Sequence, residues 1–454
     1  MEDGGRGHTT IDFNEVLQKG LKHLYTLVST QTTTFGKCAC QTLIAVKEFA
    51  EKFGCQVPWE PARNLDEALQ SIWLIYECII ISEGVPYSYS RGNMDQYLLP
   101  FAENISEEVL TEKFAVFFRF LNEVKFNDDA SALNIGGTQG FNKVSRAIIE
   151  AFVRNKMPGP MLTVHVPRKF PLEDWGRILR PELISCGQPT LYGEESCRAA
   201  LSSRGVPKEK LPFWAANSCM GLVNLADSLF TIKKLVFEEK KYTLAELKQA
   251  LKNDFADTPE LLADILRLPK FGENRGEVEK ILQQLTDDVA EIAEEFCDEE
   301  FFCTPSLHTL HKHIDCGLQL GATADGRHAG EPLVKNAGTS PMVKTVHTSL
   351  ILAASCWDQS RFSGGQPLDL WIPADVWNDP ENIHRYAALF STCFERGGLQ
   401  LQINGVDTAE LKAALEYPEK YDHLIVRIGG FSMRFIELDR RAQEDFIRRF
   451  SNGM

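Results

Sequence analysis

The sequence predicts an α/β fold with a helical N-terminal layer. Helical periodicity dominates the first 130 residues, and beyond them helices alternate with short apolar runs rich in β-branched residues. No internal repeat, low-complexity tract or long linker interrupts the chain, which favours one integrated unit. With 454 residues, 44% hydrophobic and 24% charged, the composition is that of an ordinary globular protein with a large core.

Four amphipathic segments form the predicted N-terminal layer. Apolar residues recur at helical spacing over 12–29, 41–53, 66–83 and 107–125. The longest apolar run, "IWLIYECIII" from Ile72 to Ile81, is too short to cross a bilayer and carries Glu77. We therefore expect a buried helix there and no membrane partner.

Later segments predict strands with helices between them. The strand candidates are "MLTVHV" from Met161, "TVHTSLIL" from Thr345, "LQLQI" from Leu399 and "HLIVRI" from His423. The helix candidates between them are "YTLAELKQALKNDF" and "EVEKILQQLTDDVAEIAEEF".

The stretch "RIGGF" from Arg427 places two glycines after the last predicted strand. A strand, a Gly-Gly turn and a closing helix over "LDRRAQEDFIRRF" account for the local pattern. Turn formation is thus a sufficient structural reason for Gly429 and Gly430 when the stretch is considered alone.

Charge and cysteine usage exclude several classes of function. A net charge of −15 repels polyanions, so we expect no nucleic-acid partner. The N-terminus has no apolar segment behind a basic start, and the twelve cysteines are scattered. We therefore predict a cytoplasmic protein with reduced thiols.

Two other patterns resemble metal-binding or nucleotide-binding motifs, but neither has the residue spacing that such a motif requires. The cysteine and histidine groups, Cys38 with Cys40 and Cys303, His308, His311, His313 with Cys316, lack the spacing of a structural zinc site. "NIGGTQG" from Asn134 matches neither a dinucleotide fingerprint nor a P-loop. We predict no bound metal and no bound cofactor.

Five ordered blocks resemble a known family. They are "RGNMDQYLLPF", "LNIGG", "CGQPTLYGEE", "ADGRHAGEPL" followed by Ser340 and Pro341, and "RIGGF". In this order they resemble the glycyl radical enzymes of the pyruvate formate-lyase and diol dehydratase type.

The resemblance implies an α/β barrel core with a reduced number of strands. It further implies a helical N-terminal part over 1–130, a barrel core with the catalytic cysteine loop over 131–320, and a C-terminal glycine radical domain over 321–454. The family's radical glycine directly precedes the aromatic residue, which is Gly430 here, and its catalytic cysteine corresponds to Cys219 in "WAANSCMGLVN".

Radical chemistry explains both residue types. A radical at a backbone Cα is stabilised when the carbon becomes planar and shares spin with the adjacent amides, and a side chain would obstruct that planarity. A cysteine S–H can exchange its hydrogen with a Cα at little net cost, so Cys219 would relay the radical from Gly430 to substrate. An ionised Cys219 paired with a histidine, as in cysteine hydrolases, is an alternative, but no hydrolase signature surrounds it.

Three departures from the family limit the resemblance. The glutamate that commonly stands two positions after the catalytic cysteine is replaced by Gly221, and no second cysteine adjoins Cys219. Family members are usually much longer. The charged residues in matched blocks, Arg91, Asp95, Glu194 and Glu195, are substrate-contact candidates, but none is assigned as the missing base.

The function implied is a glycyl radical enzyme, similar to formate C-acetyltransferases and lyases, that abstracts hydrogen from a small organic substrate. One alternative is a catalytically silent relative with a structural or regulatory role, and another is a radical dehydratase with an unidentified base. The resemblance further implies anaerobic metabolism, oxygen sensitivity, a homodimer and activation by a separate radical S-adenosylmethionine enzyme.

Overall fold

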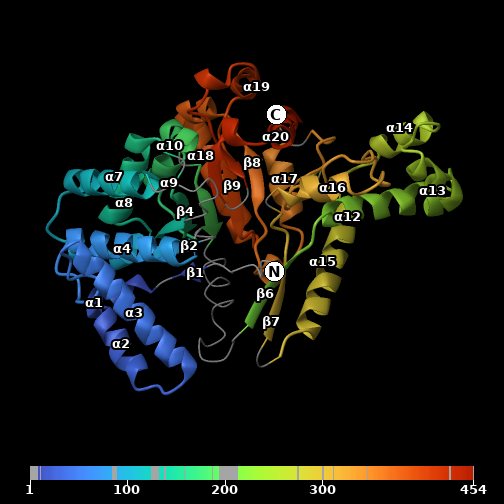
Figure 1. Cartoon of the computed structure of the whole chain (residues 1–454). Helices are drawn as coiled ribbons and strands as arrows, with labels where there is room; N and C mark the ends of the chain where they lie inside the picture. Colours follow the sequence, from blue (N-terminus) through green and yellow to red (C-terminus); the bar gives the residue numbers. More distant parts are fainter. Residues whose placement is uncertain are drawn as a thin grey trace. The chain divides into compact units, whose positions relative to one another are not determined.

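The chain folds into two compact units in the computed structural model, Met1–His165 and Val166–Met454 (Figure 1). The described residues are 9–10, 12–83, 89–123, 132–137, 140–157, 159–186, 188–193, 213–273, 276–298, 301–309, 311–344, 346–428 and 431–452. In this part of the chain, no helix is both long enough and apolar enough to cross a membrane.

The first unit combines helices with parallel strands. Its helices are α1 (Phe13–Lys19), α2 (Leu21–Ser29), α3 (Thr34–Lys52), α4 (Leu65–Glu83), α5 (Met94–Tyr97), α6 (Leu99–Ala102), α7 (Glu107–Glu123) and α8 (Lys143–Asn155). Strands β1 (Thr9–Thr10), β2 (Tyr89–Asn93), β3 (Ala132–Gly136) and β4 (Met161–Val166) pair in parallel in that order. Such pairing needs crossovers, which the helices α5–α7 and α8 supply between β2, β3 and β4.

The four helices predicted in this unit are confirmed, with two boundary corrections. The segment 12–29 is two helices, because Gly20 has φ +72° and a Cβ there would lie 2.3 Å from the Trp59 carbonyl oxygen. The segment predicted from residue 41 begins at Thr34, because the Thr33 hydroxyl caps the helix by accepting from the Gly36 N–H (3.1 Å).

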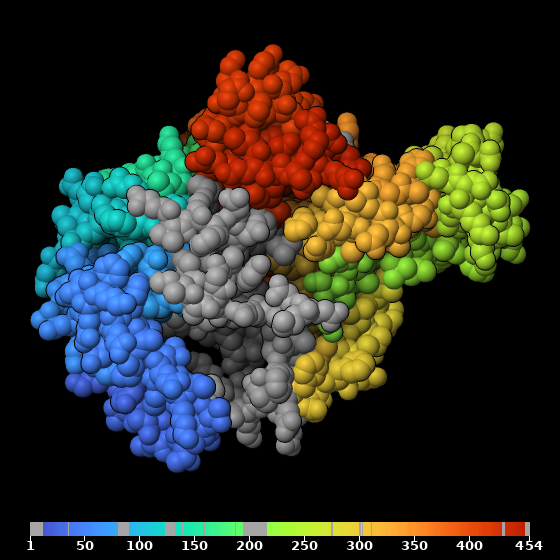
Figure 2. All heavy atoms as spheres, viewed as in Figure 1, coloured from blue at the N-terminus to red at the C-terminus, as the bar shows by residue number. Residues whose placement is uncertain are grey.

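The second unit begins with helices and three strands. Its first elements are α9 (Leu172–Ile178), α10 (Pro181–Cys186), β5 (Thr190–Gly193), β6 (Phe213–Ser218), α12 (Leu222–Thr231), the π-helix η1 (Ile232–Glu238), α13 (Leu244–Lys252), α14 (Pro259–Arg267), α15 (Glu277–Glu295), β7 (Phe301–Ser306) and α16 (Lys312–Leu318). Strands β6 and β7 pair in parallel. Helices α13 and α14 form a lobe at the end of α12, with their own apolar core (Figure 2).

The rest of the second unit carries the C-terminal motifs. It comprises α17 (His347–Ala354), η2 (Gln359–Arg361), β8 (Leu368–Trp371), η3 (Ala374–Asn378), α18 (Pro380–Glu395), β9 (Gln400–Asn404), α19 (Thr408–Glu416), η4 (Pro418–Lys420), β10 (Ile425–Ile428), β11 (Phe431–Arg434), η5 (Phe435–Glu437) and α20 (Arg440–Asn452). In this unit β9 lies between β5, to which it is antiparallel, and β8, to which it is parallel.

Most secondary-structure predictions in this unit are confirmed, and two need correction. Strand β9, strand β10, α13 and α15 form where they were predicted, whereas "TVHTSLIL" is the helix α17 rather than a strand. Leu350, Ile351, Ala353 and Ala354 are all buried, and the exposed Thr348 lies at the start of the helix, so the apolar part of the segment shows no helical period.

The second correction concerns "RIGGF". Strand β10 pairs with a second strand, β11, with Ile428 opposite Phe431, before the closing helix α20 begins. The motif therefore joins the two strands of an antiparallel hairpin, not a strand and a helix.

Candidate active site

Cys219 lies directly after β6, at the start of the turn into α12. Ser218 is opposite Ser306 in the parallel β6–β7 pair, and the Cys219 N–H donates to the Ser306 carbonyl (2.7 Å). The Ser218 hydroxyl donates to the carbonyl of His308 (3.1 Å). These two bonds hold the cysteine loop against the carboxyl end of β7.

The surroundings of Cys219 raise the pKa of its thiol. Burial raises its pKa above the usual value and the thiol of Cys303 raises it further, while the hydrogen bond with Ser306 acts in the opposite direction. A thiolate nucleophile needs a lowered pKa. The environment of Cys219 therefore suits hydrogen-atom exchange better than nucleophilic attack.

Gly221 caps α12 in a left-handed conformation with φ +81°. A Cβ at this position would lie 3.3 Å from the nearest methyl of Leu333. The position where the family commonly has glutamate is thus unfavourable for any side chain, and an apolar group occupies the adjacent space.

The "ADGRHAGEP" loop anchors α12, the helix that follows the cysteine. The Asn224 side chain donates to Asp325 (2.7 Å) and accepts from the Val334 N–H (2.8 Å). The Arg327 guanidinium donates to the carbonyls of Gly321, His328 and Glu331, which closes the loop on itself. This block of the sequence therefore positions the cysteine loop through α12.

A buried carboxyl on α12 adds a second anchor. Asp227 accepts from the Phe271 N–H (2.8 Å), and burial raises its pKa to about 7, against the opposing effect of Lys270. Burial also lowers the pKa of Lys270.

The hairpin that carries the glycines is fixed through Arg427. Gly430 itself and its neighbour Gly429 lie outside the described residues. The Arg427 N–H donates to the Asn404 side chain (2.8 Å), and its guanidinium donates to the hydroxyls of Thr190 (2.5 Å) and Ser432 (3.4 Å). Burial lowers the pKa of Arg427 to about 10. The arginine of the motif thus joins β10 to β5, β9 and β11.

A chain of buried polar groups connects the strand beside the cysteine loop to β8. The Thr309 N–H and hydroxyl both donate to the Asn336 side-chain oxygen (2.9 and 3.1 Å). Asn336 in turn donates to the carboxylate of Asp369 (2.6 Å), and this carboxylate raises the pKa of Arg427. These residues were not predicted from the sequence, because no local pattern marks a buried amide between two distant segments.

Helix α20, which follows the glycine hairpin, is bonded to α16 and to the "GEPL" segment. Asp445 accepts from the Arg449 guanidinium (2.7 Å) and lies 3.0 Å from the His313 ring. Arg449 also donates to the Leu333 carbonyl (3.0 Å), and Leu333 donates its N–H to the His313 carbonyl (3.0 Å). The pKa of Asp445 lies below its usual range, because its cationic and hydrogen-bonding partners outweigh burial.

Two substrate-contact candidates, Arg91 and Asp95, belong to the first unit and make structural contacts. Asp95 is buried, accepts from the Gly136 N–H (2.8 Å) and from Ser145 (2.5 Å), and burial raises its pKa to about 6. The Arg91 guanidinium lies over the Tyr76 ring at 4.6 Å. The other two candidates, Glu194 and Glu195, lie outside the described residues.

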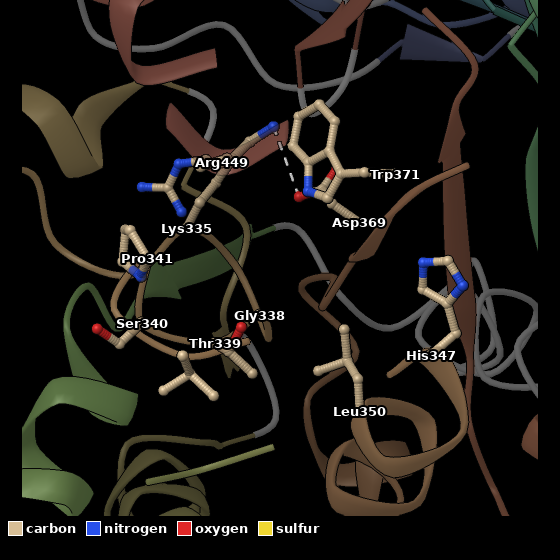
Figure 3. Close-up of a pocket in the computed structure, with 11 residues that line it drawn as sticks. Lys335, Gly338, Thr339, Ser340, Pro341, His347, Leu350, Asp369, Trp371 and Arg449 are labelled. Atoms are coloured by element: carbon tan, nitrogen blue, oxygen red, sulfur yellow. Dashed lines mark ion pairs between the residues drawn. The ribbon is translucent and has the colours of Figure 1, made fainter. Parts of the chain in front are cut away.

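A small cavity lies beside the Ser340–Pro341 block in the second unit. It has a volume of about 50 Å³ and is bounded by the loop from Lys335 to Val343, by α17, by β8 and by α20 (Figure 3). Among the described residues, no group of three or more histidine, cysteine or acidic side chains is placed to hold a metal.

Family comparisons match nearly all of the sequence blocks. The family described as pyruvate formate lyase-like matches residues 41–220 and 213–317, and the glycine radical family matches residues 336–436.

Curated relatives share this family. The chain is 27% identical over 252 residues to (2S)-3-sulfopropanediol dehydratase of Klebsiella oxytoca, covering 52% of this chain and 29% of the relative. It is 30% identical over 251 residues to the probable dehydratase YbiW of Escherichia coli, covering 52% and 31%, and 27% identical over 239 residues to isethionate sulfite-lyase of Desulfovibrio desulfuricans, covering 51% and 28%. The matched part thus spans less than a third of each of these relatives.

Solved structures share the fold. The glycerol-bound B12-independent glycerol dehydratase of Clostridium butyricum superposes with a TM-score of 0.86 at 23% identity, covering 98% of this chain and 79% of that one. A glycyl radical enzyme of Archaeoglobus fulgidus gives 0.85 at 18% identity, covering 99% and 81%. The predicted α/β fold of this class is confirmed, and the chain belongs to the glycyl radical enzyme family.

Proposed function

We propose that the protein is a glycyl radical lyase that removes a leaving group from a small organic substrate. Gly430 would store the radical and Cys219 would transfer it. The observation that carries the proposal is the cysteine loop, which places the Cys219 thiol at the carboxyl end of β6, in the same unit as the Arg427 hairpin.

The hydrogen transfers balance without any further reactant. The Cys219 S–H bond breaks and its hydrogen moves to the Gly430 Cα, leaving a glycine and a thiyl radical. The thiyl then takes a hydrogen from a substrate C–H bond and regenerates the thiol. The leaving group departs with the electron pair of its bond to carbon and takes the proton of a neighbouring substrate hydroxyl, which leaves a carbonyl and a radical on the carbon that carried the group. This product radical recovers the hydrogen from Cys219, and the thiyl takes one back from Gly430.

Elimination is favoured over acyl transfer by the residues around Cys219. Acyl transfer of the pyruvate formate-lyase type uses a second, adjacent cysteine, and here the neighbours are Ser218 and Met220. The similar proteins named above are a dehydratase, a probable dehydratase and a sulfite-lyase, and each of these names describes the loss of a small group, water or sulfite.

The silent-relative alternative has one specific observation in its favour. Gly221 not only lacks the carboxylate but has a backbone conformation that disfavours a side chain. A radical dehydratase must then draw its base from another position. An inactive relative would need none.

The proposed chemistry also requires certain partners and conditions. Nothing in the proposed scheme generates the first radical, so a radical S-adenosylmethionine activase is the expected partner. A stored carbon radical reacts with oxygen, so we propose an anaerobic cytoplasmic setting. A homodimer is proposed by likeness to the family.

Anaerobic activation followed by electron paramagnetic resonance tests the proposal. We expect a doublet, because the unpaired electron couples to the one hydrogen left on the Gly430 Cα. The signal should be lost in Gly430→Ala and kept in Gly429→Ala, the matched neighbour. A doublet that survives in Gly430→Ala, or none in the wild type, contradicts the assignment.

A solvent-exchange experiment tests the role of Cys219 without a known substrate. In D₂O the thiol becomes S–D and passes deuterium to Gly430, so the doublet should collapse. Cys219→Ser should form the radical and keep the doublet, while the exposed control Cys38→Ser should behave as the wild type. Collapse of the doublet in Cys219→Ser would exclude this cysteine as the relay.

A silent relative would give no turnover of (2S)-3-sulfopropanediol, isethionate, 1,2-propanediol or glycerol.

A further inference from the structure

The cavity beside Ser340 and Pro341 has two buried cations in its wall. Lys335 is 4% exposed and Arg449 is 8% exposed, and both line the same space of about 50 Å³. Figure 3 shows them on the wall that faces Asp369 and Trp371, with His347 and Leu350 on the opposite side. The cavity volume is enough for a few water molecules or for one ion with a handful of heavy atoms.

Lys335 has unused hydrogen-bonding capacity. Its Nζ is buried and donates no hydrogen bond to any described residue. It lies 3.5 Å from Asp369 Oδ2, beyond a good hydrogen bond, and 5.7 and 5.6 Å from the rings of Trp371 and Phe446. A buried ammonium with three donors and only one carboxylate, at 3.5 Å, is costly, so the site favours an additional acceptor.

Asp369 satisfies Lys335 only in part. Its Oδ2 already accepts a hydrogen bond from the Asn336 side chain (2.6 Å), and its negative charge raises the pKa of Arg427 against the effect of burial. The Asp369 carboxylate is therefore shared between three groups, Lys335, Asn336 and Arg427. Burial and the nearby Arg449 charge lower the pKa of Lys335, while Asp369 opposes that shift.

Arg449 offers a second donor. Its Nε bonds Asp445 and its Nη2 bonds the Leu333 carbonyl, so Nη1 is the guanidinium nitrogen with no hydrogen-bond partner among the described residues. Thr339 and Ser340 also line the cavity, and hydroxyl groups can donate to an anion. Cations with hydroxyl donors in a small, partly enclosed space are the groups that hold oxyanions.

We propose that this cavity binds a small oxyanion, a carboxylate of one or two carbons or inorganic phosphate, between Lys335 and Arg449. The bound ion would bridge the loop after "GEPL" to α20, the helix that follows the glycine hairpin. Occupancy would therefore stabilise the attachment of α20. The proposal does not depend on radical chemistry, since Cys219 is not among the described residues that line the cavity.

Isothermal titration of the full chain, without activation, tests the site with formate, acetate and phosphate as separate probes and chloride as the comparison. We expect saturable 1:1 binding of at least one oxyanion and a higher melting temperature in its presence. Comparing the carboxylates with phosphate identifies which chemistry the site prefers. Absence of binding by all three oxyanions overturns the proposal and would leave water as the occupant.

Two variants of the buried pair should change affinity in opposite directions. Lys335→Met should weaken binding at least tenfold, because the buried cation is lost. Asp369→Asn should tighten binding, because Lys335 no longer has a competing carboxylate, while Asn336 keeps an oxygen acceptor. The exposed Lys344→Met, on the same loop, should bind as the wild type does.

The opposite directions of these two affinity changes distinguish a binding site from a purely structural ion pair. If Lys335 only stabilises the fold through Asp369, both variants should lower the melting temperature and neither should alter titration with the anion. Unchanged affinity in a folded Lys335→Met, or weaker affinity in a folded Asp369→Asn, overturns the proposal. Should Lys335→Met fail to fold, the Asp369→Asn result decides alone.

Discussion

At the scale of single residues, Gly221 lacks the carboxylate that the family commonly has at this position, and its backbone conformation disfavours any side chain there. The left-handed φ of +81° is strained for any other residue, and Leu333 contacts the space where a Cβ would lie. Restoring a glutamate at this position would therefore require a local rearrangement of the turn.

We expect Gly221→Ala to lower the free energy of unfolding by about 1–2 kcal/mol, the usual cost of a left-handed non-glycine residue. Gly276→Ala is the matched control, since Gly276 also caps a helix at φ +82° but has open space around it. Urea denaturation of both variants measures the difference, and Gly221→Ala should be the more costly. A neutral or stabilising Gly221→Ala would mean that the turn relaxes freely.

At the scale of elements, the contact between α16 and α20 makes stability depend on pH. Burial and the nearby charges of Arg449 and Lys335 lower the pKa of His313 to about 4, against the opposing effect of Asp445. An unfolded histidine titrates near 6.5, so between about pH 6.5 and 4 the unfolded chain binds more protons than the folded one. The contribution of His313 is thus fully present above this window and is lost as the pH falls through it.

We expect the wild type to lose on the order of 2–3 kcal/mol of stability between pH 6.5 and 4 through His313. Urea unfolding at a series of pH values measures the slope, and His313→Gln should be flatter in that window because glutamine does not titrate. Arg448 near Asp445 and the exposed pair His328–Asp254 are unchanged in the variant. Equal slopes in the two proteins would show that His313 titrates normally.

Whether a helix or strand could be predicted from the sequence depended on the composition of its segment and on how the segment is buried. The strand β4 is matched to its residue bounds, because "MLTVHV" is β-rich and bounded by turn residues. The helix α17 was mistaken for a strand, because β-branched residues set its local preference while its largely buried apolar end gave no helical period. Strand β7 was not predicted, since "FFCTPS" contains Pro305 and has no clear alternation.

At the scale of the whole molecule, the proposed radical on Gly430 predicts that the intact chain is sensitive to oxygen. After anaerobic activation, exposure to air should cleave the chain at Gly430 and release a short C-terminal fragment. Intact mass spectrometry measures the loss, and Gly430→Ala treated in the same way should stay whole. An uncleaved wild type after a doublet has been recorded would place the radical on another residue.

The sequence alone determined the family, because that depends on ordered local blocks: the "RIGGF" hairpin residues, the "ADGRHAGEP" loop and the cysteine loop each keep their own residue types. Only the tertiary structure decided what surrounds those blocks. The acceptor for the Cys219 N–H, the side chain beside Gly221 and the cation pair of Lys335 and Arg449 all come from segments distant in sequence. Local sequence patterns show which backbone conformation a segment prefers and which of its faces is buried. Contacts between distant segments, and the pKa values that follow from those contacts, depend on how the segments pack, which no single stretch of sequence contains.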